Sequence, residues 1–278
     1  MFEKVLYPTD FSEVSLHALR NCIPRLAALG VKKLYLIHVI DITVAELEAL
    51  ELEEVYRKRL EELAEELREG GIKAEAIVRL GIPSLEISET AEEKNVDLII
   101  IPSAGENIWR RMFLGSTASN LARATRRPVL LLRYIKTDDG FRLPLDCGDI
   151  FKRPLVALDF SECSNKIVQV VKKFEELIEK GILLHSVDYG KFEELEQNIE
   201  TARKNLEEIA RGLDARFEIE ITVGIASQAI IGTAIAKDST LIVIGKKGRS
   251  VIKDILLGST AERVIRDSKL PVLLVPCG

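Results

Sequence analysis

Short apolar runs alternate with longer amphipathic stretches along the whole chain. Leu98-Ile99-Ile100-Ile101 is typical of the short runs, because four consecutive apolar residues suit a strand that is buried on both faces. The stretch 43–69 is typical of the longer ones, since its apolar residues recur at helical spacing. Strictly alternating strands and helices predict right-handed crossovers and a doubly wound parallel sheet.

The first half of the chain is predicted to hold five strands and four helices. The acidic stretch 61–66 belongs to one of these helices and is interpreted as a solvated helix face, because leucines interrupt it at helical spacing. We expect the strands at 5–7, 34–40, 72–79, 97–101 and 129–132, and the helices at 12–29, 43–69, 83–94 and 116–124.

A five-residue string occurs twice and indicates a duplication. Leu-Gly-Ser-Thr-Ala at 114–118 returns at 257–261, an offset of 143 residues, and many apolar positions around it repeat at that offset. Asp10-Phe11-Ser12 likewise returns as Asp159-Phe160-Ser161. The chain is therefore predicted to contain two copies of one domain, each a doubly wound five-stranded α/β sheet. The predicted boundaries are 1–135 for the first domain, 136–153 for a linker and 154–278 for the second domain.

Composition narrows the class of protein. Hydrophobic residues make up 47% of the 278 residues, which excludes a disordered chain. The formal net charge of −5 argues against a broad basic surface that binds nucleic acid electrostatically. No apolar run approaches the roughly 20 residues of a membrane helix, and the N-terminal segment MFEKVLYPTDFS lacks the apolar core of a signal peptide. A soluble, cytoplasmic protein without a membrane partner is expected.

The four cysteines are sparse. Cys22, Cys147, Cys163 and Cys277 show neither a Cys-x-x-Cys pair nor a metal-ligand spacing. We therefore expect buried or incidental thiols in a reducing compartment.

Glycines and basic residues follow one predicted strand of the second copy. The apolar run 241–244 leads into Gly245-Lys246-Lys247-Gly248-Arg249, and Gly258-Ser259-Thr260 then opens a helix. Glycines let the backbone approach a phosphate, and a helix N-terminus attracts anions. Asp159 ends the first strand of this copy, across the crevice where doubly wound sheets bind ligands, and suits ribose hydroxyls or a metal held by phosphates. The alternative is that these glycines only form tight turns and that Ser259 is an ordinary helix cap.

The longer pattern resembles a known family. Gly245-x-x-Gly248-x₉-Gly258-Ser259, with Val-Ala-Leu-Asp-Phe-Ser at 156–161 and Pro-Val-Leu-Leu-Val at 271–275, is similar to the universal stress protein family, and the resemblance covers both halves. It implies an adenine nucleotide α-hydrolase-like fold with strand order 3-2-1-4-5 and an adenine-nucleotide ligand. Carried onto the second copy, the binding residues are Asp159, Ser186, Ile244, Gly245, Gly248, Arg249, Gly258, Ser259 and Thr260; Ser186 stands where the family usually has valine.

The first copy departs further from the family pattern. Pro102 replaces the first loop glycine, and Glu106 stands where the second copy has Arg249, so this site is expected to be weaker. The retained positions are Asp10, Val39, Gly105, Gly115, Ser116 and Thr117. The ligand is expected to be ATP or AMP, with Mg²⁺ accompanying ATP.

Catalysis has little support in the sequence. No spacing suggests a nucleophile with its base, and the phosphate-loop and dinucleotide-binding motifs are absent. A nucleotide-binding stress or regulatory protein is therefore the leading hypothesis. The alternatives are a slow ATPase or phosphotransferase, and an interaction module with vestigial nucleotide sites.

The resemblance also bears on partners. In the family the final strands pair across a dimer, which implies here an intramolecular pseudo-dimer of the strands 129–132 and 272–275. A further homodimer and a protein partner are left open.

Overall fold

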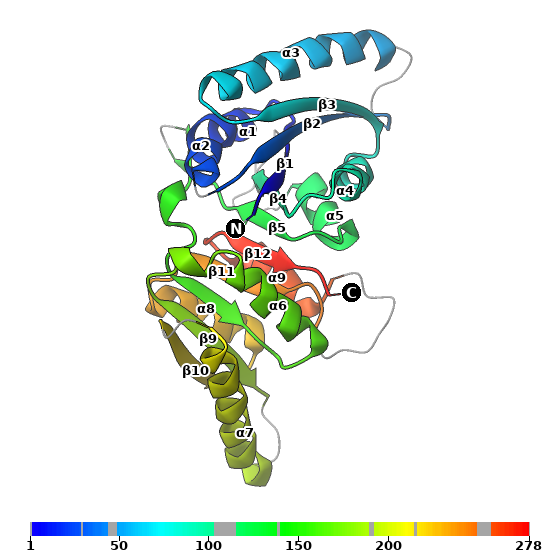
Figure 1. Cartoon of the computed structure of the whole chain (residues 1–278). Coiled ribbons are helices and arrows are strands. Elements are labelled where there is room, and N and C mark those ends of the chain that lie inside the picture. The colour runs from blue at the N-terminus through cyan, green and yellow to red at the C-terminus, as the bar shows by residue number, and fades with distance from the viewer. Residues whose placement is uncertain are drawn as a thin grey trace. The chain divides into compact units, whose positions relative to one another are not determined.

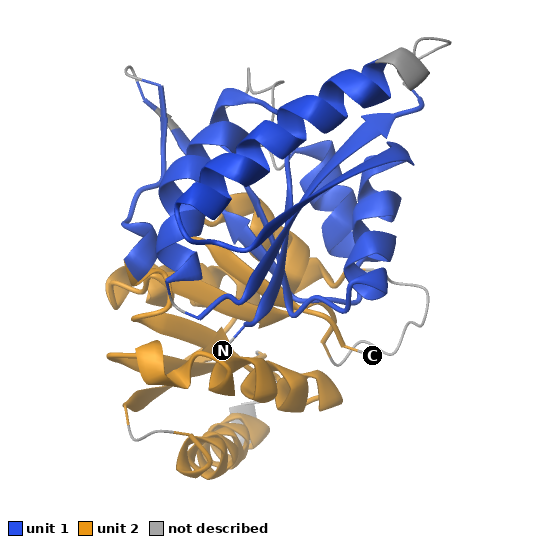
Figure 2. Cartoon of the chain, turned by 45° about the horizontal axis from the view of Figure 1, so that its top comes forward, with its two compact units in different colours: residues 1–148 blue, residues 149–278 orange. Residues whose placement is uncertain are grey.

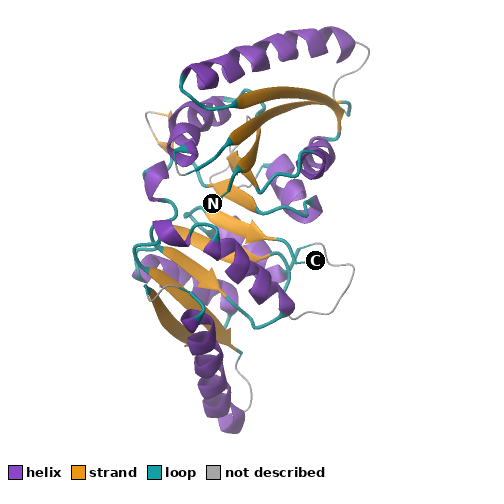
Figure 3. Ribbon diagram, in the orientation of Figure 1, coloured by secondary structure: helices purple, strands orange, loops and turns teal. Residues whose placement is uncertain are grey.

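The computed structural model describes residues 2–28, 30–43, 49–102, 115–137, 140–188, 192–213, 216–248 and 257–277. The chain divides into two compact units, Met1–Gly148 and Asp149–Gly278 (Figure 2). Strands alternate with helices in both units (Figure 3).

The first unit contains one parallel five-stranded sheet (Figure 1). A helical segment begins at Ser12, whose hydroxyl accepts the Ser15 N–H at 3.3 Å, and a π-helical turn, Ala18–Cys22, separates its two α-helical parts. Helices α4 and α5 pack together. The helices are α1 (Glu13–His17), α2 (Ile23–Ala27), α3 (Ala49–Glu69), α4 (Pro83–Glu93) and α5 (Ser116–Ala124), and the strands β1 (Lys4–Pro8), β2 (Lys33–Asp41), β3 (Ala74–Gly81), β4 (Leu98–Pro102) and β5 (Val129–Leu132), in the order β3-β2-β1-β4-β5.

The second unit repeats this architecture. Its strands are also parallel, and helices α8 and α9 pack together as α4 and α5 do. Both sheets therefore have the predicted 3-2-1-4-5 order. The elements are β8 (Pro154–Ala157), α6 (Glu162–Lys172), β9 (Gly181–Val187), α7 (Phe192–Arg211), β10 (Phe217–Val223), α8 (Ala226–Ala236), β11 (Leu241–Gly245), α9 (Ser259–Asp267) and β12 (Val272–Val275), with the sheet order β10-β9-β8-β11-β12.

Strand β11 shows why the chain folds in this way. All five of its residues are buried, and it pairs with β8 on one side and β12 on the other. An all-apolar strand is stable only where both its faces and both its edges are covered, as in a central parallel strand. The chain leaves β8 toward β9 and leaves β11 toward β12, so a topological switch point lies between β8 and β11. Among the residues that the structure describes, no helix is long and apolar enough to cross a bilayer.

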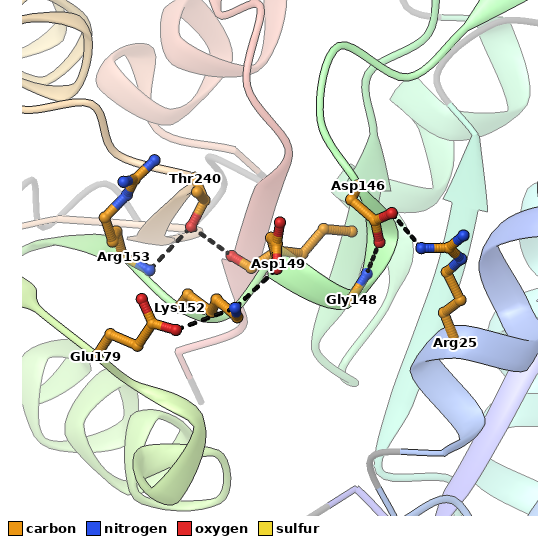
Figure 4. Close-up of polar contacts among 9 residues, drawn as sticks. Arg25, Asp146, Gly148, Asp149, Lys152, Arg153, Glu179 and Thr240 are labelled. Carbon is orange, nitrogen blue, oxygen red and sulfur yellow. Dashed lines mark hydrogen bonds and ion pairs between the residues drawn. The ribbon is translucent and has the colours of Figure 1, made fainter.

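The stretch predicted as a linker contains regular structure. Strands β6 (Ile135–Thr137) and β7 (Gly140–Arg142) form an antiparallel hairpin, and a short 3₁₀ turn covers Cys147–Asp149. Side chains attach each part of this stretch to its own unit (Figure 4). In the first unit, the Asp146 carboxylate pairs with Arg25 and accepts the Gly148 N–H. In the second unit, the Lys152 ammonium pairs with the carboxylates of Asp149 and Glu179. Thr240 Oγ1 accepts the Arg153 N–H there.

The interpretation of the cysteines as incidental thiols was wrong, because all four are paired. Cys22 and Cys147 form one disulfide in the first unit, with their Cα atoms 5.2 Å apart. Cys163 and Cys277 form the second, in the other unit, with their Cα atoms 4.9 Å apart. The partners are 125 and 114 residues apart in sequence, so no local spacing could have indicated the pairing. Folding brings them together.

Candidate functional site

A cavity of about 260 Å³ lies at the carboxyl ends of β8, β9 and β11. This is the switch point of the second sheet, where doubly wound folds bind ligands. Of the residues predicted for the second site, the structure brings eight around this one cavity; Arg249 lies outside the described residues. The eight are Asp159, Ser186, Ile244, Gly245, Gly248, Gly258, Ser259 and Thr260.

Asp159 is held in place by the turn that follows β8. Its Oδ1 atom accepts the Ser161 N–H at 3.0 Å and the hydroxyls of Ser161 and Ser164 at 2.6 and 3.1 Å. Phe160 between them has φ of 61°, a left-handed conformation that is uncommon for a bulky residue. Phe11 in the first unit has φ of 59°, so both copies make the same turn.

The other oxygen of Asp159 faces the glycine loop. A Cβ atom built on Gly248 would lie 2.8 Å from Asp159 Oδ2. The carboxylate and the loop backbone therefore approach each other closely across the cavity, and only a residue without a side chain leaves this gap open.

Gly245 is required for a reason that the sequence did not suggest. A Cβ atom there would lie 2.5 Å from Cys163 Sγ and 3.1 Å from the Lys247 carbonyl oxygen. The position therefore has no room for a side chain, whether or not a phosphate approaches it. Gly258 anchors the far end of the loop, because its N–H donates to the Lys246 carbonyl at 2.8 Å.

Helix α9 presents its N-terminus to the cavity. Its N-cap is Gly258, and no side chain of the described residues caps it. Ser259 therefore belongs to the first turn of the helix, and the interpretation of Ser259 as an ordinary cap does not apply. The N–H groups of that turn, and the hydroxyls of Ser259 and Thr260, suit an anion.

Among the residues that the structure describes, two charges of each sign line the cavity. Lys246 and Lys247 come from the glycine loop, and Lys246 is only 8% exposed. The carboxylates belong to Asp159 and Asp188, which follow β8 and β9. Positive groups from the loop and negative groups that follow the neighbouring strands suit a ligand with an anionic part and a hydroxyl-bearing part.

Several lining residues were missed by sequence reasoning. Asp188 follows a buried strand and could have been found by the same rule that singled out Asp159. Ala226 and Ile230 lie four residues apart on α8 and form an apolar wall. His185 also lines the cavity; its Nδ1 atom is 2.7 Å from the Leu158 carbonyl oxygen, and its ring is 4.4 Å from that of Phe160. The Ser186 hydroxyl donates to the Gly224 carbonyl oxygen at 3.0 Å.

The first unit keeps only part of this arrangement within the described residues. Asp10 accepts the Ser12 N–H at 3.0 Å, as Asp159 accepts that of Ser161. Val39 lies in β2, Gly115 is the N-cap of α5, and Ser116 and Thr117 open that helix. Gly105, with the whole stretch 103–114, lies outside the described residues.

An aromatic cluster follows β1 of the first unit. The Phe11 ring stacks on Tyr56 at 5.7 Å and lies under the Arg59 guanidinium at 4.3 Å. His38 packs against both rings, and its Nδ1 atom is 2.8 Å from the Thr9 carbonyl oxygen. Burial lowers the pKa of His38 below its ordinary value, so the ring is held neutral.

These features define an α/β protein of two doubly wound units, with a glycine loop at the switch point of the second. The sequence profile of the Universal stress protein family matches residues 1–133 and 151–276. The chain therefore belongs to the universal stress protein family, in a tandem two-domain form.

The chain is similar to individual proteins and solved structures. The universal stress protein MJ0577 of Methanocaldococcus jannaschii is 33% identical over 156 residues, which cover 48% of this chain and 96% of that protein. A crystal structure of a universal stress protein from Archaeoglobus fulgidus DSM 4304 has 26% identity and a TM-score of 0.75, and the alignment covers 99% of this chain and 98% of that one. Another universal stress protein has been solved in complex with cAMP; it is 24% identical and covers 45% of this chain and 96% of its own, with a TM-score of 0.37.

Proposed function

We propose that this chain is a stress-response or regulatory protein that binds an adenine nucleotide, ATP or AMP, in the second unit. The observation that carries the proposal is one cavity lined together by a Gly-x-x-Gly loop, the N-terminus of α9 and a carboxylate across from them. Each group supplies what one part of a nucleotide requires.

The phosphates would lie against the loop and the helix. Backbone N–H groups, the hydroxyls of Ser259 and Thr260, and the ammonium groups of Lys246 and Lys247 are donors for phosphate oxygens. The Asp159 carboxylate, which the serines of the turn hold at the cavity, would accept from a ribose hydroxyl. The apolar pair Ala226 and Ile230 offers a face for the base.

Mg²⁺ would enter with the phosphates of ATP rather than occupy a cage of protein ligands. Among the described residues, no group of three or more histidine, cysteine or acidic side chains could hold a metal. Mg²⁺ commonly binds through one or two carboxylates together with substrate phosphates. Asp188, which lines the same cavity, is the carboxylate that would do so while Asp159 binds the ribose.

The first unit is proposed to bind the nucleotide more weakly. Its sequence has Pro102 and Glu106 where the second copy has Gly245 and Arg249. Proline removes a backbone donor, and a glutamate repels phosphate.

Mass spectrometry of small molecules released from the purified protein, followed by a turnover assay with ATP and Mg²⁺, tests the function. We expect co-purified or added adenine nucleotide without turnover. Accumulation of ADP would instead support a slow ATPase, and no binding of ATP or AMP would leave an interaction module. The matched variants are Gly248→Val, which should lose most of the binding, and Gly105→Val, which should lose less; equal losses would contradict the asymmetry between the two copies.

A further inference from the structure

The disulfide of the second unit lies directly behind the glycine loop. Cys163 is the second residue of α6, four positions after Asp159, and it is 4% exposed. Cys277 lies two residues beyond β12 and is half-buried. The bond therefore joins the start of α6 to the chain that leaves the last strand.

Both sulfur atoms contact the loop itself. Cys163 Sγ lies 2.5 Å, and Cys277 Sγ 3.3 Å, from the position that a Cβ on Gly245 would take. Cys277 Sγ is also 3.5 Å from the Lys247 carbonyl oxygen. Gly245 and Lys247 also line the cavity. The same stretch of loop backbone therefore contacts the disulfide and lines the proposed nucleotide site.

The pair is specific to the second copy. The first copy has Val14 at the second position of α1 and Tyr134 two residues beyond β5, the places that correspond to Cys163 and Cys277. Tyr134 contacts His17 there, at 3.2 Å between its hydroxyl oxygen and Nδ1. The disulfide of the first unit, Cys22–Cys147, lies at different positions. A cysteine pair is therefore found behind the loop in the copy that retains the glycine pattern.

We propose that Cys163–Cys277 is a redox-active disulfide, opened by a dithiol reductant, whose state sets the nucleotide affinity of the second unit; this inference rests on the proposed function. A thiolate of the reductant attacks the half-buried Cys277 sulfur, and Cys163 leaves as a thiolate that takes up a proton. The second thiol of the reductant then attacks the mixed disulfide and releases Cys277 as a thiol. Two electrons and two protons pass from the dithiol to the pair, and the reductant ends as a disulfide.

Opening the bond changes the support of the loop. Two separate thiols need a full van der Waals contact distance between them, so the sulfur atoms must move apart inside a packed region. The atoms in their way are the backbone of Gly245 and the carbonyl of Lys247. The oxidised pair holds this backbone in a single arrangement, whereas the reduced pair releases it. Because a preorganised site binds more tightly, the oxidised form is the stronger binder.

The test is ATP titration by calorimetry on the full chain, in the oxidised state and after treatment with dithiothreitol. Differential alkylation with mass spectrometry records which cysteines are free in each sample. The variant Cys163→Ser/Cys277→Ser removes the pair, and Cys22→Ser/Cys147→Ser is the matched control that removes the other disulfide. We expect reduction to raise the Kd for ATP about three- to tenfold in the unaltered chain and in the control. The Cys163→Ser/Cys277→Ser variant should bind with the weaker Kd in both conditions.

The alternative outcomes separate this inference from the proposed function. Equal ATP affinity with Cys163 and Cys277 bonded and free would overturn the redox control while leaving nucleotide binding intact. Free thiols at these two positions after oxidation with glutathione disulfide would also overturn it. Absence of ATP and AMP binding in both redox states would overturn the proposed function and the redox control together.

Discussion

Gly248 and Asp159 show how one missing side chain can shape a site. Asp159 cannot easily move aside for a new methyl group, because three hydrogen bonds from Ser161 and Ser164 hold its other oxygen. A Cβ on Gly248 would stand 2.8 Å from its Oδ2. The glycine thus keeps open the gap between the two walls of the cavity.

The Gly248→Ala variant is therefore expected to bind ATP about tenfold more weakly, which corresponds to about 1.4 kcal/mol. Isothermal titration calorimetry measures the change. Gly232→Ala is the matched control, since a Cβ at Gly232 meets nothing within 4 Å. Unchanged affinity in Gly248→Ala would contradict the prediction.

The lowered pKa of His38 predicts how the stability of the first unit depends on pH. Burial lowers its pKa in the folded state, so the unfolded chain, with an ordinary pKa of about 6.5, takes up a proton first as the pH falls. The stability of the first unit should therefore fall as the pH drops below about 6.5 toward the folded pKa. Urea unfolding at several pH values between 7.5 and 5 measures it. The His38→Gln variant should lose less stability over this range, and parallel pH profiles would contradict the prediction.

Helix α8 contributes an apolar wall to the cavity while carrying a glycine on its exposed side. Gly232 lies in the middle of α8, is exposed and has open space where a Cβ would be. A glycine inside a helix costs free energy relative to alanine, because the unfolded chain gains more freedom. The face of α8 that matters for the site is the one with Ala226 and Ile230.

Gly232→Ala should accordingly raise the free energy of unfolding of the second unit by about 0.5–1 kcal/mol. Thermal unfolding followed by circular dichroism measures the shift, and ATP affinity should not change. A lower midpoint would mean that the position has a neighbour in the folded protein.

The Cys22–Cys147 disulfide joins two elements of the first unit that are distant in sequence. It ties the 3₁₀ turn at Cys147–Asp149 to the π-helical turn that ends at Cys22. Arg25, three residues after Cys22, forms an ion pair with Asp146, which precedes Cys147. Together these contacts attach the end of the first unit to its first helical segment.

The Cys22→Ser/Cys147→Ser variant should lose about 2–4 kcal/mol of stability in the first unit, chiefly because its unfolded chain is no longer constrained. Differential scanning calorimetry under oxidising conditions measures the loss. The Cys163→Ser/Cys277→Ser variant serves as the control, since its bond lies in the other unit. An unchanged transition of the first unit would contradict the prediction.

The duplicated chain contains two versions of one candidate site, and their differences lead to a prediction for the whole molecule. Calorimetric titration should give a stoichiometry close to one tightly bound ATP per chain. Saturating ATP should stabilise the second unit selectively, by about 2.7 kcal/mol at a hundredfold excess over Kd. Two equal sites per chain would contradict the proposed difference between the copies.

Much of the fold could be predicted because its signals are local or repeated. Helix α5 and strand β5 have the predicted bounds, since apolar periodicity and glycine or proline at their ends are carried by neighbouring residues. Elsewhere the ends differ by a few residues; β3, for example, extends to Gly81. The hairpin of β6 and β7 was missed because each strand has only three residues, too few to show a period.

The sequence by itself determined the duplication, the alternation of strands and helices, and the edge of the sheet at which a site would form. These follow from the repeated string, from hydrophobic spacing and from the handedness of parallel crossovers. Only the tertiary structure decided the cysteine pairing, the reason why Gly245 must be a glycine, and the part played by α8 in the cavity. Those features depend on atoms that are far apart in sequence, and only the packing of the folded chain brings them into contact.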